Sequence, residues 1–330
     1  MTLTRDELQR MASTTGFQSG PLEKVLRLME LLEAIVAHPY LRDRVALKGG
    51  TALNLFLFDV PRLSVDIDLN YVGASDLATM RVERPLLEQA IEAVCGRLDL
   101  SVRRAPREHA GGKWRFSYAA VAGGTGTLEL DVTFMLRTPL WPLARMDSRL
   151  VASRKAVGIP VLDVHELAAG KLAALVARGA SRDLFDACEL LRRSDFDRTR
   201  LRLAFVVYGG MNPRDWRTLR IEDVVATAAD VGSQLVPMLR ADLAPVRANL
   251  AAWTDALVRE CQALLSAVLP LDSNELAFLE KLNGSGEIAP ELLTDNASLQ
   301  AIIRDHPGLR WKAINVRRHS APLPPTDEQP

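Results

Sequence analysis

ALKGGTALNLFLFDVPRLSVDIDLNY, residues 46–71, is the stretch that decides the fold. Its first part is a short apolar run that meets Gly49, Gly50 and Thr51, and the residues that follow have helical character. The sequence therefore predicts a strand, a glycine turn and a helix. Glycine at such a turn lets backbone N–H groups approach an anion closely, and the helix N-terminus adds partial positive charge. With Lys48 and the Thr51 hydroxyl beside them, the two glycines are predicted to bind phosphate.

The second part of the stretch predicts a strand that carries two acids, Asp66 and Asp68. Side chains alternate along a strand, so its two faces are Val65, Ile67 and Leu69 on one side and Ser64, Asp66, Asp68 and Asn70 on the other. The two carboxylates then point the same way, about 6 to 7 Å apart. Such a pair suits Mg²⁺, a hard cation held by a few carboxylates plus substrate phosphates. A solvated strand face would show the same alternation, but the glycine turn upstream favours a metal site.

The combination of GGT, a short helix and R-x-S-x-D-I-D resembles the signature of the DNA polymerase β-like nucleotidyltransferase superfamily. The segments LKGGTAL and RLSVDIDL resemble the sequences of its AbiEii branch. That branch contains the toxins of AbiE-type abortive-infection toxin–antitoxin systems and the related MenT toxins. Thr51 stands where serine is commoner, and the hydroxyl is kept. The resemblance implies catalytic roles for Asp66 and Asp68 and places Arg62 and Ser64 among the nucleotide-binding residues.

Length and composition bound the protein class. At 330 residues the chain has room for about two domains, each with its own core. Lys+Arg and Asp+Glu number 41 each, so nucleic-acid binding must rest on a local patch. The three cysteines lack metal-ligand spacing, which is typical of buried thiols in a reducing compartment. The N-terminus has no apolar signal core and no run is apolar enough to span a membrane, so we expect a cytoplasmic protein.

Hydrophobic periodicity outlines the rest of the N-terminal half. Residues 22–36 place apolar side chains on one stripe, which predicts a helix packed on the core. A second helix is expected over 77–98, followed by strands at 100–104, 113–121 and 127–136 between glycine-rich turns. Strands that follow a helix, rather than strict alternation of the two, indicate an α+β fold with a mixed sheet and helices on it.

Asp131 and Glu129 are candidates for a third carboxylate. The strand over 127–136 carries both on one face, together with Thr133. The polymerase β-like resemblance implies a metal-binding carboxylate on a neighbouring strand. We favour Asp131, with Glu129 as the alternative, and both could also be ordinary surface residues.

Lys171 lies on the apolar stripe of a predicted helix. A lysine there either extends its charge to solvent or reaches over the core edge to bind triphosphate. The surrounding run resembles an AbiEii pattern, K-L-x-A-L-x-x-R-x-x-x-R-D-x-x-D, which implies that the lysine and a downstream aspartate belong to the active site. Asp183 and Asp186 both qualify. We favour Asp186 for catalysis and expect Asp183 to pair locally with Arg182.

The domain prediction divides the chain at residue 159, where it is expected to turn helical, with Asp163 and Glu166 as a capping box. A nucleotidyltransferase-like sheet domain is expected over 1–158. A helical domain that contributes to the active site follows over 159–319. The proline-rich tail, 320–330, is expected to be disordered.

Two basic groups interleaved with tryptophan could bind a polyanion such as an RNA end. They are Arg103, Arg104, Arg107, His109, Lys113 and Arg115 beside Trp114, and Arg310, Lys312, Arg317 and Arg318 beside Trp311. Solvated surface charge is the better explanation of either group when it is taken alone.

The resemblance also implies a function. It predicts a Mg²⁺-dependent toxin nucleotidyltransferase that takes a nucleotide from a nucleoside triphosphate, transfers it to the 3′ end of tRNA, blocks translation and arrests growth. A cognate antitoxin would neutralise it. The alternatives are transfer to a small molecule or a protein side chain, and a catalytically idle nucleotide-binding module.

Overall fold

A mixed β-sheet forms the centre of the computed structural model, which describes residues 3–104, 111–193 and 195–320. Within these residues the sheet has seven strands: β1 Val45–Lys48, β2 Asp66–Tyr71, β3 Ser101–Arg104, β4 Gly111–Ala119, β5 Thr125–Thr133, β6 Ala144–Met146 and β7 Ile159–Val161. Their order across the sheet is β3-β4-β5-β2-β1-β7-β6. The pairs β2–β5 and β1–β7 are parallel, and the other neighbours are antiparallel.

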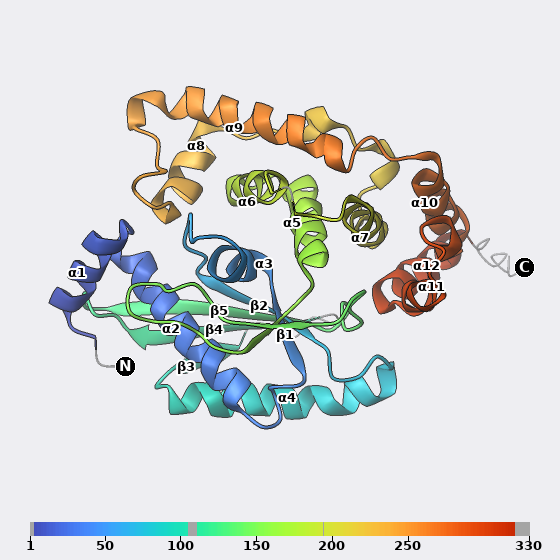
Figure 1. The fold of residues 1–330 in the computed structure, drawn as a ribbon. Helices are drawn as coiled ribbons and strands as arrows, with labels where there is room; N and C mark the ends of the chain where they lie inside the picture. Colours follow the sequence, from blue (N-terminus) through green and yellow to red (C-terminus); the bar gives the residue numbers. More distant parts are fainter. Residues whose placement is uncertain (1–2, 105–110, 194, 321–330) are drawn as a thin grey trace, which may run out of the picture.

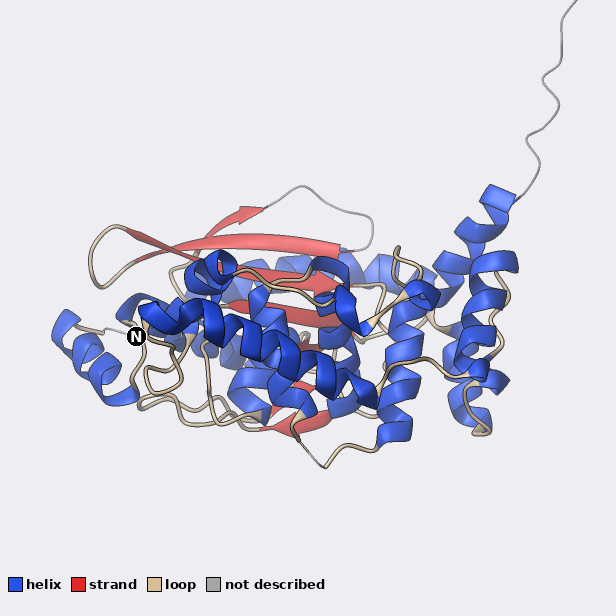
Figure 2. Cartoon of the chain, turned by 90° about the horizontal axis from the view of Figure 1, so that it is seen from above, coloured by secondary structure: helices blue, strands red, loops and turns tan. Residues whose placement is uncertain are grey.

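Helices cover both faces of this sheet (Figure 1). The described α-helices are α1 Arg5–Thr15, α2 Ser19–Ala37, α3 Gly49–Ala52, α4 Leu77–Arg97, α5 Val164–Arg178, α6 Ser181–Leu191, α7 Arg198–Gly210, α8 Ala228–Asp230, α9 Leu250–Leu264, α10 Ser273–Ser285, α11 Ala297–Asp305 and α12 Pro307–Ser320. Helices α2 and α4 lie on one face, and α3, α5 and α6 on the other. The view from above in Figure 2 shows α10–α12 gathered at one end of the molecule.

The predicted patterns account for the two elements that hold the sheet centre. Helix α2 buries the stripe from Leu22 to Ile35. The helix ends at Ala37, with His38 as its C-cap directly before Pro39. In β2, Ile67 and Leu69 are buried, whereas Asp66 and Asp68 are half-buried on the opposite face. The apolar face of the sheet therefore packs toward α2 and α4, and the acidic face is turned toward α3, α5 and α6. The predicted α+β class with a mixed sheet is confirmed.

The structure differs from the prediction at residue 159. Ile159–Val161 does not turn helical but forms β7, which pairs with β1 through Leu47 and Val161. The helix after the glycine pair also begins earlier than expected, at Gly49, and continues as a π-helical turn over Leu53–Leu57. Short apolar runs do not distinguish a buried strand from the start of a helix, so pairing with β1 decides the first case.

Three predictions concern residues outside the described ranges: Arg107, His109 and the tail from residue 321 onward. Among the residues that the structure describes, no helix combines the length and the apolar character needed to cross a membrane.

Candidate active site

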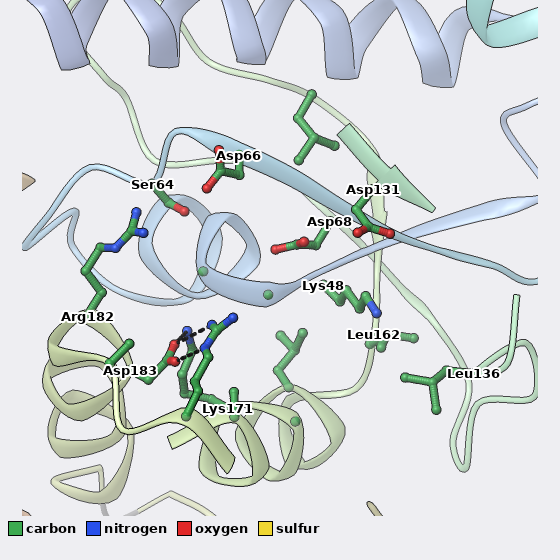
Figure 3. A pocket seen from close by; sticks show the side chains of 18 of the residues that line it. Lys48, Ser64, Asp66, Asp68, Asp131, Leu136, Leu162, Lys171, Arg182 and Asp183 are labelled. Atoms are coloured by element: carbon green, nitrogen blue, oxygen red, sulfur yellow. Dashed lines mark hydrogen bonds and ion pairs between the residues drawn. The ribbon is translucent and has the colours of Figure 1, made fainter. Parts of the chain in front are cut away.

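The acidic face of the sheet brings three of the predicted carboxylates together. Asp68 on β2 lies in register with Asp131 on β5 and with Lys48 on β1, and Asp66 lies in register with Glu129. Parallel pairing of β2 with β5 puts both strands' side chains on the same face at the same level. Figure 3 shows Asp66, Asp68 and Asp131 along the strands, with Lys48 below the last two.

Gly49 is required by the approach of α3 to β2. Its φ of +71° lies in the left-handed region, which favours glycine. A Cβ atom at this position would clash with the Asp68 carboxylate. At Gly50 a Cβ would lie 2.8 Å from Ser64 Oγ and 3.0 Å from an Arg62 nitrogen. Both glycines therefore let the start of α3 lie directly against the acidic strand.

Electrostatics on the sheet side favour a bound cation. Burial and the neighbouring charge of Asp68 raise the pKa of Asp66 above its usual value. Burial lowers the pKa of Lys48, although Asp68 and Asp131 oppose that shift, and Lys48 Nζ donates to Thr133 Oγ1 at 2.8 Å. A carboxylate whose pKa is raised by burial and by a neighbouring carboxylate is stabilised in its charged form by a nearby cation.

The Thr51 hydroxyl does not lie where a contact with a bound phosphate would require it. It is fully buried, and its hydroxyl donates to the Asp66 carbonyl oxygen at 2.5 Å. Its side chain ties the first turn of α3 to the start of β2.

The other side of the site is built by α5 and α6. Lys171 is buried rather than extended to solvent, and its Nζ lies 2.8 Å from Asp183 Oδ1 and 2.9 Å from Asp186 Oδ2. Arg178 also binds Asp183, at 2.5 Å, while 65% of the Arg178 side chain stays exposed. Burial would raise the pKa of Asp183, but Lys171 and Arg178 outweigh it and lower the pKa.

Asp186 lies behind Lys171 and is completely buried. Both of its oxygens accept from Arg62, at 2.7 and 2.5 Å, and Oδ1 also accepts from Asn54 at 3.0 Å. Burial would raise the pKa of Asp186, yet the charges of Arg62 and Lys171 outweigh it and hold the pKa at about 2. The Arg62 guanidinium, predicted to bind nucleotide, is committed to this carboxylate and to the Leu63 carbonyl oxygen.

A cavity of about 620 Å³ separates the sheet side from the helix side. Among the predicted residues it is lined by Lys48, Gly49, Gly50, Arg62, Ser64, Asp66, Asp68, Glu129, Asp131, Lys171 and Asp183. Thr51 and Asp186 are not among the lining residues. In Figure 3 the acids of the strands face Lys171, Arg182 and Asp183 across the cavity. The arrangement places a carboxylate-bearing surface of the sheet opposite a helix surface that carries Lys171 and Arg182.

Comparison with known proteins identifies the family. Residues 30–317 match the model of the nucleotidyl transferase AbiEii toxin of type IV toxin–antitoxin systems. The chain belongs to the AbiEii family. The fold resembles that of MenT4, a nucleotidyltransferase toxin of Mycobacterium tuberculosis H37Rv, with a TM-score of 0.64, 19% identity, and coverage of 92% of this chain and 100% of MenT4. JHP933 from Helicobacter pylori is less similar, with a TM-score of 0.47, 14% identity and coverage of 76% and 94%. A search of curated proteins finds no significant match.

The two candidate third carboxylates of this AbiEii chain differ in their surroundings. Glu129 binds Arg115 at 2.6 Å and Lys113 at 3.1 Å, and these cations lower its pKa. Asp131 instead lies in register with Asp68. Over the described residues, no three His, Cys, Asp or Glu side chains form a group that could hold a metal by themselves. Two carboxylates remain compatible with Mg²⁺, because substrate phosphates and water supply its other ligands.

Three pocket residues were not singled out as site residues from the sequence. Arg182 lines the cavity, and its charge opposes the rise in the pKa of Asp66 that burial and Asp68 cause. Asp183 pairs with Lys171 and Arg178 and not with Arg182, the expected partner. Glu166 and Tyr208 line the same cavity from α5 and α7. Asp163 caps α5, but Glu166 does not complete the expected capping box; its carboxylate accepts from the Trp141 N–H and the Tyr208 hydroxyl. Partners this distant in sequence leave no local signal.

Proposed function

We propose that this chain transfers a nucleotide from a nucleoside triphosphate to the 3′ end of tRNA, which blocks translation and arrests growth. The observation that carries the proposal is the cavity in which Asp66 and Asp68 face Lys171 and Arg182. Membership of the AbiEii family supports the transferase chemistry and the use of a nucleoside triphosphate.

The triphosphate is proposed to lie between the glycine turn and the helix side. Backbone N–H groups at Gly49 and Gly50 begin a helix and favour an anion. The Lys171 ammonium has three N–H donors and uses two of them on Asp183 and Asp186, so one remains for a phosphate oxygen. Lys48 and Arg182 add charge from the two sides of the cavity.

Asp66 and Asp68 are proposed to hold Mg²⁺, with Asp131 beside Asp68 as the third carboxylate. When bound, Mg²⁺ supplies stabilisation of the charge that develops on the transferring and leaving phosphates. The acceptor hydroxyl attacks the α-phosphorus, the bond from that phosphorus to the bridging oxygen breaks, and pyrophosphate leaves. Asp131 is positioned to take the proton of the hydroxyl. The helix-side cations bind the departing pyrophosphate.

Asp186 and Thr51 are proposed to position the site rather than to contact the substrate. Asp186 orients Lys171 and Arg62 from behind the cavity wall. Thr51 fixes the start of β2, from which Asp66 projects. Their burial and their committed hydrogen bonds support these roles over a metal-ligand or base role for Asp186 and a phosphate contact for Thr51.

An RNA acceptor is supported by basic side chains that continue from the acidic face of the sheet. Lys113 lines the cavity in register with Asp131, and Arg115 lies two residues further along β4. Arg103 on β3 is exposed and in register with Arg115. This row runs from the carboxylates toward the β3 edge, where it would attract a phosphate backbone. We further propose that the chain acts in the cytoplasm and that a cognate antitoxin neutralises it.

Labelled nucleotide transfer tests the proposal. The protein would be incubated with each α-labelled nucleoside triphosphate, Mg²⁺ and total RNA, and the labelled product would be resolved by size. We expect label in the tRNA fraction, none with Lys171→Met, and growth arrest on expression of the wild type only. Methionine keeps the apolar stem of lysine, Asp183 keeps Arg178 and Asp186 keeps Arg62, so the variant should fold with reduced stability, which circular dichroism would check. Transfer that persists in Lys171→Met would remove the helix side from the active site.

The salt dependence of RNA binding separates the acceptors. A polyanion acceptor predicts affinity that falls with salt, and a shallower slope when Arg103 and Arg115 are replaced by glutamine. Label that appears only on protein or on a small molecule would contradict tRNA as the acceptor. Absence of label on any acceptor, together with retained nucleotide binding, would favour an idle module.

A further inference from the structure

The wall of the cavity changes character from one end to the other. Near Arg182 and Asp183 it is charged, whereas Figure 3 shows Leu162 beside Lys48 and Leu136 further away from Arg182 and Asp183. The lining also includes Glu166 and Leu167 in the first turn of α5, shortly after Leu162, together with Gly170 and with Tyr208, whose hydroxyl donates to Glu166. A charged end suits phosphates, and an apolar end with one or two fixed polar groups suits a flat, uncharged group.

Helix α5 joins the two ends. Glu166 precedes Lys171 by five residues, which corresponds to about 7.5 Å along a helix, and both side chains line the cavity. A ligand whose phosphates reach Lys171 therefore has its other end beside Glu166. Gly170 lies between them, and a Cβ there would be 3.6 Å from the Tyr208 ring. The bare backbone at this position leaves the wall flat next to the tyrosine.

Glu166 is held in place by hydrogen bonds and, in the part of the chain that the structure describes, makes no ion pair. Oε2 accepts from the Trp141 N–H at 3.2 Å and Oε1 accepts from the Tyr208 hydroxyl at 3.1 Å. A carboxylate has about four acceptor sites, so both oxygens are oriented without being saturated. Burial raises the pKa of Glu166 to about 7 despite these hydrogen bonds. A further N–H donor from a ligand would stabilise the carboxylate.

We propose that this end of the cavity binds the base of the nucleoside triphosphate, and that Glu166, positioned by Tyr208, selects the base by accepting a hydrogen bond from an N–H group on its edge. The inference rests on the proposed function and adds a specificity-determining residue to it. Leu162 and Leu167 would contact the faces of the base, and Gly170 leaves room for its ring.

Calorimetric binding of the four nucleoside triphosphates and of inorganic triphosphate tests the inference. The proteins would be the full chain and the variants Glu166→Gln, Tyr208→Phe and Glu275→Gln. Glu275 is also a buried carboxylate, but it binds Arg202 from α10 and does not line the cavity, so it is the matched control. A further probe is an analogue of the preferred nucleotide that lacks the base N–H donor.

We expect the wild type to prefer one nucleotide and to bind its analogue less tightly. Glu166→Gln should lower affinity for the preferred nucleotide by about 10- to 100-fold, the range for a hydrogen bond to a charged group. Its affinity for inorganic triphosphate should not change, and the analogue should no longer be distinguished. Tyr208→Phe keeps the ring and the carboxylate and should reduce the same preference by a smaller factor. Glu275→Gln should keep the wild-type preference.

Two results would overturn the base-selection role. Equal weakening of all nucleotides and of inorganic triphosphate in Glu166→Gln would show that Glu166 only ties α5 to residue 141 and α7. Unchanged affinity ratios among the four nucleotides in both Glu166→Gln and Tyr208→Phe would also exclude a role of Glu166 in base selection. A wild-type protein that binds neither nucleotide nor triphosphate contradicts the proposed function itself, and so is distinguishable from a failure of this inference.

Discussion

Replacing Asp186 with asparagine is expected to lower the free energy of unfolding by about 3 to 5 kcal/mol, the cost of removing one partner from a buried ion pair. The shape of the side chain is kept, but the negative charge between Arg62 and Lys171 is lost. Lys171 retains Asp183 at 2.8 Å. Arg62 retains only neutral acceptors, the Leu63 carbonyl oxygen at 2.9 Å and the amide oxygen of the substituted side chain, so its buried charge is left without a counter-charge.

The loss should be large against a total stability of about 5 to 15 kcal/mol. Urea denaturation followed by circular dichroism would measure it. Asp183→Asn is the matched control on the same helix. Its partner Arg178 is mostly exposed and can return to water, and Lys171 keeps Asp186, so a loss of about 1 to 2 kcal/mol is expected.

A double-mutant cycle isolates the interaction. Arg62→Met combined with Asp186→Asn removes both charges, and the pair should be coupled by at least about 2 kcal/mol. The reasoning would be refuted by an Asp186→Asn variant whose unfolding free energy matches the wild type while nucleotide transfer is lost. That result would place Asp186 in the chemistry of the site and not behind its wall.

Three further predictions concern the sheet side and Glu166. Asp68→Ala should keep the fold, lower the pKa of Asp66 by removing a like charge, and reduce labelled-nucleotide transfer by about 10³-fold or more; near-wild-type transfer would exclude Asp68 from the site. Gly49→Ala should displace the Asp68 carboxylate and strain a backbone with φ of +71°, so both stability and nucleotide transfer should fall. A variant that is as active and as stable as the wild type would contradict the close approach of α3 to β2. Burial raises the pKa of Glu166 from 4.5 to about 7, so the folded state binds this proton more tightly than the unfolded state does. The stability that the protonated group contributes is therefore present below pH 4.5 and is lost as the pH rises through 7. The unfolding free energy of the wild type relative to Glu166→Gln should therefore fall by about 3 kcal/mol between pH 4.5 and 8, and a constant difference would contradict the raised pKa.

The carboxylate pair and the glycine turn of this protein could be predicted from its sequence because both depend on local spacing. Alternation along β2 predicts that Asp66 and Asp68 share a face, and the glycine pair predicts a strand-to-helix turn; the structure has both. The pairing of β2 with β5 sets Asp131 in register with Asp68, on a neighbouring strand. Its role as a third metal-binding carboxylate stays a prediction. Lys171 could be narrowed to two interpretations, and its burial in an ion-pair cluster excludes the solvent-extended one.

Only tertiary structure decided which acid faces the cavity and which lies behind it. Asp183 and Asp186 are one turn apart on α6, and the preference for Asp186 drawn from the sequence could not include its burial. Asp186 is covered by Arg62, which lies 124 residues away in the sequence. Glu166 has a capping-box spacing, yet it turns to partners 25 and 42 residues away. Ile159–Val161 becomes a strand because β1 offers an open edge. Local pattern determines conformation and the alternation of faces, whereas burial and charge pairing depend on which distant segments pack against each residue.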